Sequence, residues 1–255
     1  MKTTIRLNNS SYFLYCQCKD ASSKKAILIV PNSAGYFAKS TKYGEASSRI
    51  DKFCDDLSEK FHVYYLILSG QDPSKASILY FLFSGPDREG DKYSYSGSVD
   101  AVIEALKAIS QKQELVGVIG MCTGGAIATE AMGKTSFNSL PLILYNTAAS
   151  VGWNDPAIQK IFLRKYRDFV NLDCEELQRN APASLVSIVK QHKGKMLQIA
   201  SGNSDYKIER QRELTQAIPG LTKVEFPTMS DAPIGESPEY QPMMELIFKF
   251  FSENK

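Results

Sequence analysis

Short apolar runs alternate with amphipathic stretches along most of the 255 residues. Runs rich in β-branched and aromatic residues predict buried strands, and apolar positions at helical spacing predict helices. The expected strands cover residues 11–18, 25–30, 63–68, 115–119, 140–145, 195–200 and 222–226. The expected helices cover residues 43–60, 97–113, 123–133 and 239–252. This alternation indicates the α/β class, with a mostly parallel sheet covered by helices on both faces.

The stretch 152–191 interrupts the alternation of strands and helices. Residues 161–170 predict an amphipathic helix, and two further helices are expected, one after Asp173 and one after Pro182. We interpret 152–191 as a small helical lid inserted into one domain that is formed by residues 1–151 and 192–255. The basic and aromatic side chains of the lid would also suit a membrane surface, but we favour an amphipathic lid helix that faces the core.

Composition excludes several classes of protein. The chain is 43% hydrophobic and 23% charged, which is ordinary for a globular domain. A formal net charge of +2 gives no reason to expect a nucleic acid or a membrane as partner. No apolar run reaches the length of about 18 residues that a membrane-spanning helix requires. Residues Met1–Arg6 lack the apolar core of a signal peptide.

The five cysteines are scattered and odd in number, which indicates reduced thiols and a cytoplasmic protein rather than a disulfide framework. Cys16 and Cys18 lie two apart in a predicted strand and therefore share a face. No second pair of ligands lies near them in the sequence, so we expect no metal and no other cofactor.

The strongest chemical signal is the segment Val118–Gly125, where a predicted strand leads into Gly-x-Cys-x-Gly-Gly and then into a helix of small residues. Such a turn imposes strained backbone angles on Cys122 and lifts its side chain above the sheet. Gly120 and Gly124 leave room for neighbouring chain. The helix N-terminus favours a thiolate, and the N–H of Thr123 is suited to stabilising an oxyanion. The plain alternative is a small buried cysteine in a tight turn.

With this motif between a strand and a helix, the chain resembles the α/β-hydrolase superfamily over essentially its whole length. A cysteine at the nucleophile position is similar to the dienelactone hydrolases and to a minority of thioesterases. The resemblance implies an eight-stranded type of sheet, a catalytic acid after the strand that follows the lid, and a histidine after the last strand. It assigns the acid to Asp205, which would also suit capping of the following helix.

The histidine position is the main departure from the family. The usual loop pattern, P-x-x-G-H-x-P-x-x-E-x-P, aligns with Pro227–Pro238 and puts Asp231 where the histidine stands. His62 and His192 both precede predicted strands, at the edge of the sheet opposite to the usual ligand site, and we expect both at the surface. The catalytic residues that the resemblance implies are Cys122, Asp205 and Asp231.

The loop after the predicted strand at residues 25–30 also departs from the family. Many relatives carry His-Gly there, whereas this chain has Pro31–Tyr36. Backbone N–H groups of Asn32 or Ser33 can still serve, because an oxyanion hole needs donors rather than particular side chains. The two side chains could also bind substrate, and a plain turn is the alternative. The expected oxyanion and substrate-binding residues are Thr123, Asn32 and Ser33.

Three functions remain open at this point. In the first, the chain is a thioesterase-like hydrolase or acyltransferase. Cys122 takes an acyl group from a small or carrier-bound ester, thioester or lactone, and hydrolysis, acyl transfer or cyclisation follows. In the second, Asp231 is the acid or base of a lyase, isomerase or cyclase. In the third, the protein only binds a ligand.

A carboxylate beside Cys122 disfavours the thiolate, although two aspartates that share a proton can become better bases. A homodimer is also open.

Overall fold

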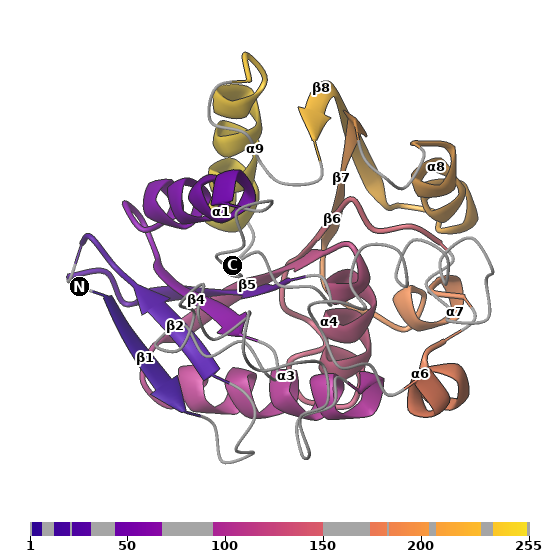
Figure 1. Cartoon of the computed structure of the whole chain (residues 1–255), viewed down its shortest axis with the longest axis horizontal. Helices are drawn as coiled ribbons and strands as arrows, with labels where there is room; N and C mark the ends of the chain where they lie inside the picture. The colour runs from indigo at the N-terminus through magenta and orange to yellow at the C-terminus, as the bar shows by residue number, and fades with distance from the viewer. Residues whose placement is uncertain are drawn as a thin grey trace.

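A central sheet with helices on both sides forms the body of the molecule (Figure 1). The computed structural model describes residues 2–6, 13–20, 22–31, 44–67, 94–149, 174–182, 184–203, 208–230 and 237–253. The strands are β1 (Lys2–Arg6), β2 (Phe13–Gln17), β3 (Lys25–Val30), β4 (His62–Ile67), β5 (Glu114–Met121), β6 (Leu142–Tyr145), β7 (Met196–Asn203) and β8 (Thr222–Ser230). The helices are α1 (Gly44–Leu57), α3 (Tyr95–Ser110), α4 (Thr123–Gly133), α6 (Cys174–Asn180), α7 (Val186–Val189), α8 (Ile208–Ala217) and α9 (Tyr240–Glu253). None of these described helices is both long and apolar enough to span a membrane.

Within the described residues, the sheet has eight strands in the order β1-β2-β4-β3-β5-β6-β7-β8. Strands β4, β3, β5, β6, β7 and β8 run parallel to one another. Strands β1 and β2 pair antiparallel, and β2 pairs antiparallel with β4. These pairings confirm the mostly parallel α/β architecture expected from the sequence. Each parallel connection needs a crossover segment, and that segment covers one face of the sheet.

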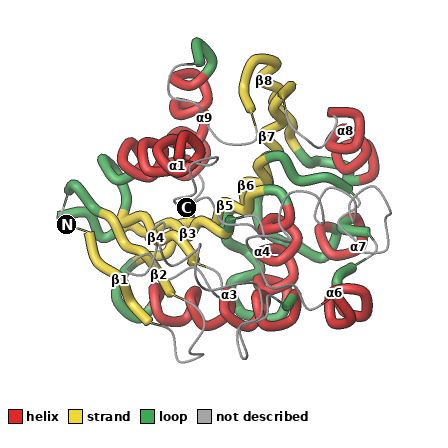
Figure 2. The backbone as a smooth tube through the Cα atoms, viewed as in Figure 1, coloured by secondary structure: helices red, strands yellow, loops and turns green. Residues whose placement is uncertain are grey.

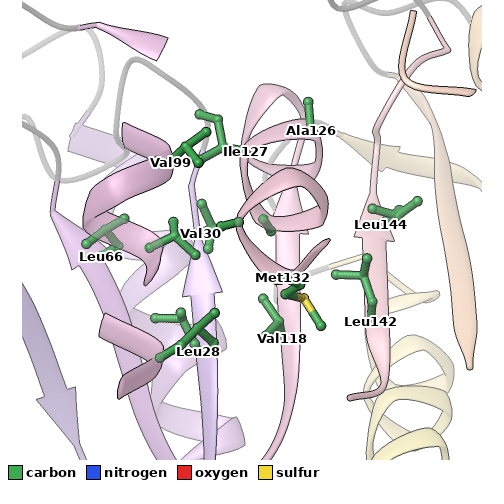
Figure 3. Close-up of a cluster of buried hydrophobic side chains, with 14 of the residues drawn as sticks. Leu28, Val30, Leu66, Val99, Val118, Ala126, Ile127, Met132, Leu142 and Leu144 are labelled. Carbon is green, nitrogen blue, oxygen red and sulfur yellow. The ribbon is translucent and has the colours of Figure 1, made fainter. Parts of the chain in front are cut away.

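Alternate side chains of the central strands enter two separate cores. Leu28, Val30, Val118, Leu142 and Leu144 pack against α3 and α4 on one face (Figure 3). On the other face, side chains of intervening positions pack against α1 and α9. Figure 2 shows these two helices on the side of the sheet opposite to α3. A strand buried on both faces needs an unbroken apolar run, which explains the β-branched runs in the sequence.

Strands β5 and β8 extend further than the sequence indicated. The last residues of β8 pair with the end of β7, after a register shift between Ser201 and Asn203. This pairing accounts for the extra length of β8, because backbone groups beyond residue 226 find partners on β7. The extension carries both strands further toward the edge at which the parallel strands end.

Helix α6 is fastened to the start of α3 by Glu176. Its carboxylate accepts hydrogen bonds from the backbone N–H of Tyr95 at 2.6 Å and of Ser96 at 2.8 Å, and from the side chain of Asn180 at 2.9 Å. Burial alone would raise the pKa of Glu176, but these hydrogen bonds, including one from the Ser96 hydroxyl, outweigh it and hold the pKa below its ordinary value. A carboxylate at a helix N-terminus also interacts favourably with the helix dipole.

The later part of the stretch 152–191 therefore packs against α3 and α4. Leu177, Leu185 and Val189 are buried in the same core as the side chains of those two helices. Helices α6 and α7 occur where two helices were expected, whereas the expected helix at residues 161–170 lies outside the described residues. The lid and its boundaries stay a prediction.

Candidate functional site

The turn at Cys122, which we call the elbow, joins the end of β5 to the start of α4. Cys122 has φ 51° and ψ −120°, a left-handed conformation that residues other than glycine rarely adopt. Its backbone N–H donates to the oxygen of Tyr145 at 2.8 Å, and its own oxygen accepts from the N–H of Gly125 at 3.0 Å. The side chain is 4% exposed. The strained strand-to-helix turn expected from the motif is therefore present.

Close packing around this turn explains its glycines. A Cβ added to Gly124 would lie 2.2 Å from the oxygen of Pro31 and 2.3 Å from that of Val30. A Cβ added to Gly120 would lie 2.5 Å from the Cα of Gly125. Since all of these neighbours are backbone atoms, helix α4 can approach the ends of β3 and β5 only if both positions carry glycine.

Cys122 lies at the edge where the parallel strands end, which is the usual ligand-binding edge of such sheets. Strands β6, β7 and β8 follow β5 in order and end at the same edge. Asn203 of β7 pairs with Ser230 of β8 at this edge. Asp205 and Asp231 follow these two paired residues closely in the sequence, but both lie outside the described residues. Their roles stay predictions.

The expected oxyanion residues are only partly described. Thr123 is the first residue of α4 and is 8% exposed, which puts it at the helix N-terminus next to Cys122. Asn32 and Ser33 follow Pro31 at the end of β3 but lie outside the described residues. Strand β3 ends beside the elbow, because the backbone oxygens of Val30 and Pro31 lie against Gly124.

The two ends of the connection that contains Asp231 are held together by Glu239. Its carboxylate accepts hydrogen bonds from the backbone N–H of Thr228 at 2.7 Å and of Met229 at 3.2 Å, and from the Thr228 hydroxyl at 2.7 Å. Glu239 lies just before α9, and Thr228 and Met229 lie in the last part of β8. These hydrogen bonds fasten the last part of β8 to the residues just before α9.

Three buried polar residues near the elbow were not identified from the sequence. Asn146 has φ 52°, and Asn146, Thr147 and Gln198 are each 0% exposed. Their hydrogen bonds connect the end of β6 with the elbow and with β7. The available signal was a polar residue within or directly after an apolar strand, since a buried polar group needs a partner.

The histidines lie away from the elbow, at the opposite edge of the sheet, as expected. His62 begins β4 and is half-buried, and one ring nitrogen lies 2.7 Å from the oxygen of Ser23. The expectation that His192 lies at the surface is wrong: its side chain is buried, with Nε2 3.0 Å from the oxygen of Leu140. Among the described residues its Nδ1 has no hydrogen-bond partner, and burial lowers the pKa of the ring. The cause is that the turn before β7 folds against the loop before β6. There the backbone N–H of Lys193 donates to the backbone oxygen of Asn138.

A hollow of about 680 Å³ also lies at this opposite edge. The residues that line it come from the starts of β7 and β8 and from the end of α9, and include Met196, Thr222, Leu246 and Phe250. The hollow is therefore separate from the elbow. In the described part of the chain, no group of three or more histidine, cysteine or acidic side chains is arranged to hold a metal ion.

Comparison with known proteins finds similarity in structure only. No family model and no curated protein matches the sequence. The enol-lactonase from Burkholderia xenovorans LB400 matches with a TM-score of 0.63 at 17% identity, covering 98% of this chain and 100% of that chain. Est1E from Butyrivibrio proteoclasticus matches with a TM-score of 0.67 at 10% identity, covering 99% and 98%.

A third match is MGS-M2, described as an alpha/beta hydrolase enzyme from a Medee basin deep-sea metagenome library. Its TM-score is 0.63 at 17% identity, and the match covers 99% of this chain and 98% of that chain. Identities this low compare folds rather than activities. Together with the strand order and the strained turn at Cys122, these matches show that the chain has the α/β-hydrolase fold.

Proposed function

We propose that this protein is an enzyme that accepts an acyl group on Cys122 from an ester, a thioester or a lactone. The observation that carries the proposal is the backbone of Cys122, which has a positive φ at the junction of β5 and α4. Strain of this kind persists only where the surroundings enforce it, and it concentrates at functional sites. A cysteine at a helix N-terminus is also favourably placed to react as a thiolate.

The chemistry requires a proton acceptor, and Asp231 takes this role in the proposal. The sulfur of Cys122 attacks the carbonyl carbon of the substrate, and the thiol proton passes to the Asp231 carboxylate. The tetrahedral adduct then breaks its bond to the leaving oxygen or sulfur, which receives that proton. Backbone N–H groups of Thr123, Asn32 or Ser33 stabilise the oxyanion in this step.

The acyl group then passes to water or to another nucleophile. That nucleophile attacks the acyl-cysteine and gives its proton to Asp231, and the departing Cys122 sulfur takes the proton back. Asp205 serves as the second carboxylate, and a proton shared between two nearby aspartates would raise the basicity of Asp231. The pairing of Asn203 with Ser230 supports this arrangement, because each aspartate follows one member of the pair closely.

The choice of substrate class draws on the structural neighbours. One of them is named an enol-lactonase, and another is described as an alpha/beta hydrolase enzyme. Hydrolysis of an ester or a lactone is therefore the first reaction to test. Thioester hydrolysis and acyl transfer follow from the same intermediate, because a cysteine ester can pass its acyl group to any nucleophile that reaches it.

Turnover of a panel of p-nitrophenyl esters, short acyl thioesters and small lactones tests the proposal. Cys122→Ala should reduce turnover to the uncatalysed background. Cys54→Ala is the matched control, because Cys54 is also buried but lies in α1 on the other face of the sheet, and this variant should keep full activity. Asp231→Asn should lower kcat by a factor of about 100 or more, the usual contribution of a general base.

Two results would contradict the proposal. Activity that survives Cys122→Ala but is lost in Asp231→Asn would replace it with acid–base chemistry at Asp231. Absence of turnover across the whole panel, from a folded wild-type protein that binds one of the compounds, would favour the ligand-binding function instead.

A further inference from the structure

A chain of hydrogen bonds begins at the elbow and crosses the end of β6. The backbone oxygen of Cys122 accepts a hydrogen bond from the Thr147 hydroxyl at 3.1 Å. The backbone oxygen of Thr147 accepts one from the side-chain amide of Gln198 at 2.9 Å. The strained residue of the elbow is thus connected to β7 through a single intervening residue.

Gln198 continues the chain into helix α8. Its amide nitrogen also donates to the backbone oxygen of Gln211 at 2.9 Å, and its amide oxygen accepts from the hydroxyl of Thr215. Thr147, Gln198 and Gln211 are all 0% exposed. A buried polar group that loses its partner is costly, so these hydrogen bonds fix the orientation of the Gln198 side chain.

The two elements that Gln198 joins flank the proposed acid. Strand β7 ends at Asn203 and α8 begins at Ile208, so the connection of residues 204–207 that contains Asp205 lies between them. A second link reaches β7 from Asn146, whose side-chain oxygen accepts from the N–H of Ser201 at 2.7 Å. The end of β6 therefore holds both the elbow and the strand that leads to Asp205.

We propose that Thr147 and Gln198 are positioning residues that hold Cys122 in register with the connection carrying Asp205. The inference rests on the proposed function, because that function gives the placement of Cys122 relative to Asp205 a catalytic purpose. Neither residue needs to touch the substrate: Thr147 acts through the backbone of Cys122, and Gln198 acts through Thr147 and α8. A hydrogen bond suits this role better than an apolar contact because it fixes direction as well as distance.

The alternative is that the network only stabilises the core, and Thr129 provides the control that separates the two roles. Thr129 is a threonine of α4, 1% exposed, whose hydroxyl donates to the backbone oxygen of Gly125 at 2.6 Å. That hydrogen bond lies within one helix and does not reach β7. Replacing Thr129 or Thr147 with valine removes one buried, hydrogen-bonded hydroxyl in each case, so the two substitutions should destabilise the fold to a similar extent.

Steady-state kinetics on the best substrate of the panel is the first test. Thr147→Val should lower kcat about tenfold while KM stays within about twofold, because a small misplacement of reacting groups affects the chemical step. Gln198→Met should have the same effect, because it breaks the same network of hydrogen bonds at the end farther from Cys122. Thr147→Ser, which keeps the hydroxyl, and Thr129→Val should stay within about twofold of wild type. Equal effects of Thr147→Val and Thr129→Val would overturn the inference.

A second test does not depend on turnover and so separates this inference from the proposed function. The rate of alkylation of the Cys122 peptide by iodoacetamide is followed by mass spectrometry across a range of pH. Thr147→Val should change that rate at least about threefold in the wild-type background, and the change should disappear in the Asp205→Asn background. Additive effects of the two substitutions would overturn the inference, even if the enzyme proves active. If the effect of Thr147→Val depends on Asp205 but the protein turns over no substrate, the positioning role is supported and the proposed activity is refuted.

Discussion

Replacing Gly124 with alanine tests how closely the elbow is packed against β3. The added Cβ would lie 2.2 Å from the oxygen of Pro31 and 2.3 Å from the oxygen of Val30. Ordinary van der Waals contact of a Cβ begins at 3.4 Å, so α4 would have to move by roughly 1 Å relative to the strand. Because the neighbours are backbone atoms in a densely packed sheet, no rotamer change can relieve the overlap.

We therefore expect Gly124→Ala to lower the free energy of unfolding by about 3 kcal/mol or more, at the upper end of the usual cost of overpacking. For a chain of this size that corresponds to a decrease of about 6–12 °C in Tm. Urea unfolding followed by circular dichroism gives the free energy directly.

Gly133→Ala is the matched control in the same helix. Gly133 is in the last turn of α4, and a Cβ there would meet nothing within 4 Å. Alanine is the better helix former, so this variant should be as stable as wild type or gain up to about 1 kcal/mol. Equal stabilities of the two alanine variants would refute the reasoning, because they would mean that α4 does not press on the end of β3.

Three further predictions concern residues outside the elbow. Tyr240→Phe removes the hydrogen bond from its hydroxyl to the Asp56 carboxylate at 2.7 Å and should cost about 1.5–3 kcal/mol in chemical unfolding. Glu176→Gln weakens the cap on α3 and should cost about 1–2 kcal/mol above pH 4.5, with the difference from wild type vanishing as acid protonates Glu176 through its lowered pKa. Burial makes the pKa of His192 lower in the folded protein than in the unfolded chain, so the unfolded chain binds a proton on this imidazole more readily. Wild type should therefore lose Tm as the pH falls below 6.5, and His192→Gln should show a smaller decrease.

The fold could be predicted from local patterns because each central strand is an apolar run and each covering helix has an apolar face. The helix at residues 123–133 matches its prediction to the residue, since a run of small residues directly after the elbow leaves little choice of start. The strained angles at Cys122 could be predicted as well, because two glycines around a cysteine between a strand and a helix have a steric cause that the structure bears out.

The hydrogen bonds behind the elbow could not be predicted in this way. Thr147 and Gln198 are 51 residues apart, and no local periodicity predicts a hydrogen bond between a side chain and a backbone oxygen that far apart in the sequence. The burial of His192 was missed for a related reason: its position before a strand defines the edge of the sheet, whereas its depth depends on the loop before β6. Asp205, Asp231, Asn32 and Ser33 rest on the resemblance to the family alone.

The most direct measurement of the central claim is the intact mass of the protein after brief incubation with the activated esters and acyl thioesters. Wild type and Cys122→Ala are compared side by side, and peptide mapping locates any added mass. We expect an acyl adduct on wild type that maps to Cys122 and is absent from the variant. An adduct of equal yield on Cys122→Ala, or turnover by wild type without any adduct even after rapid acid quenching, would contradict the claim that Cys122 is the nucleophile.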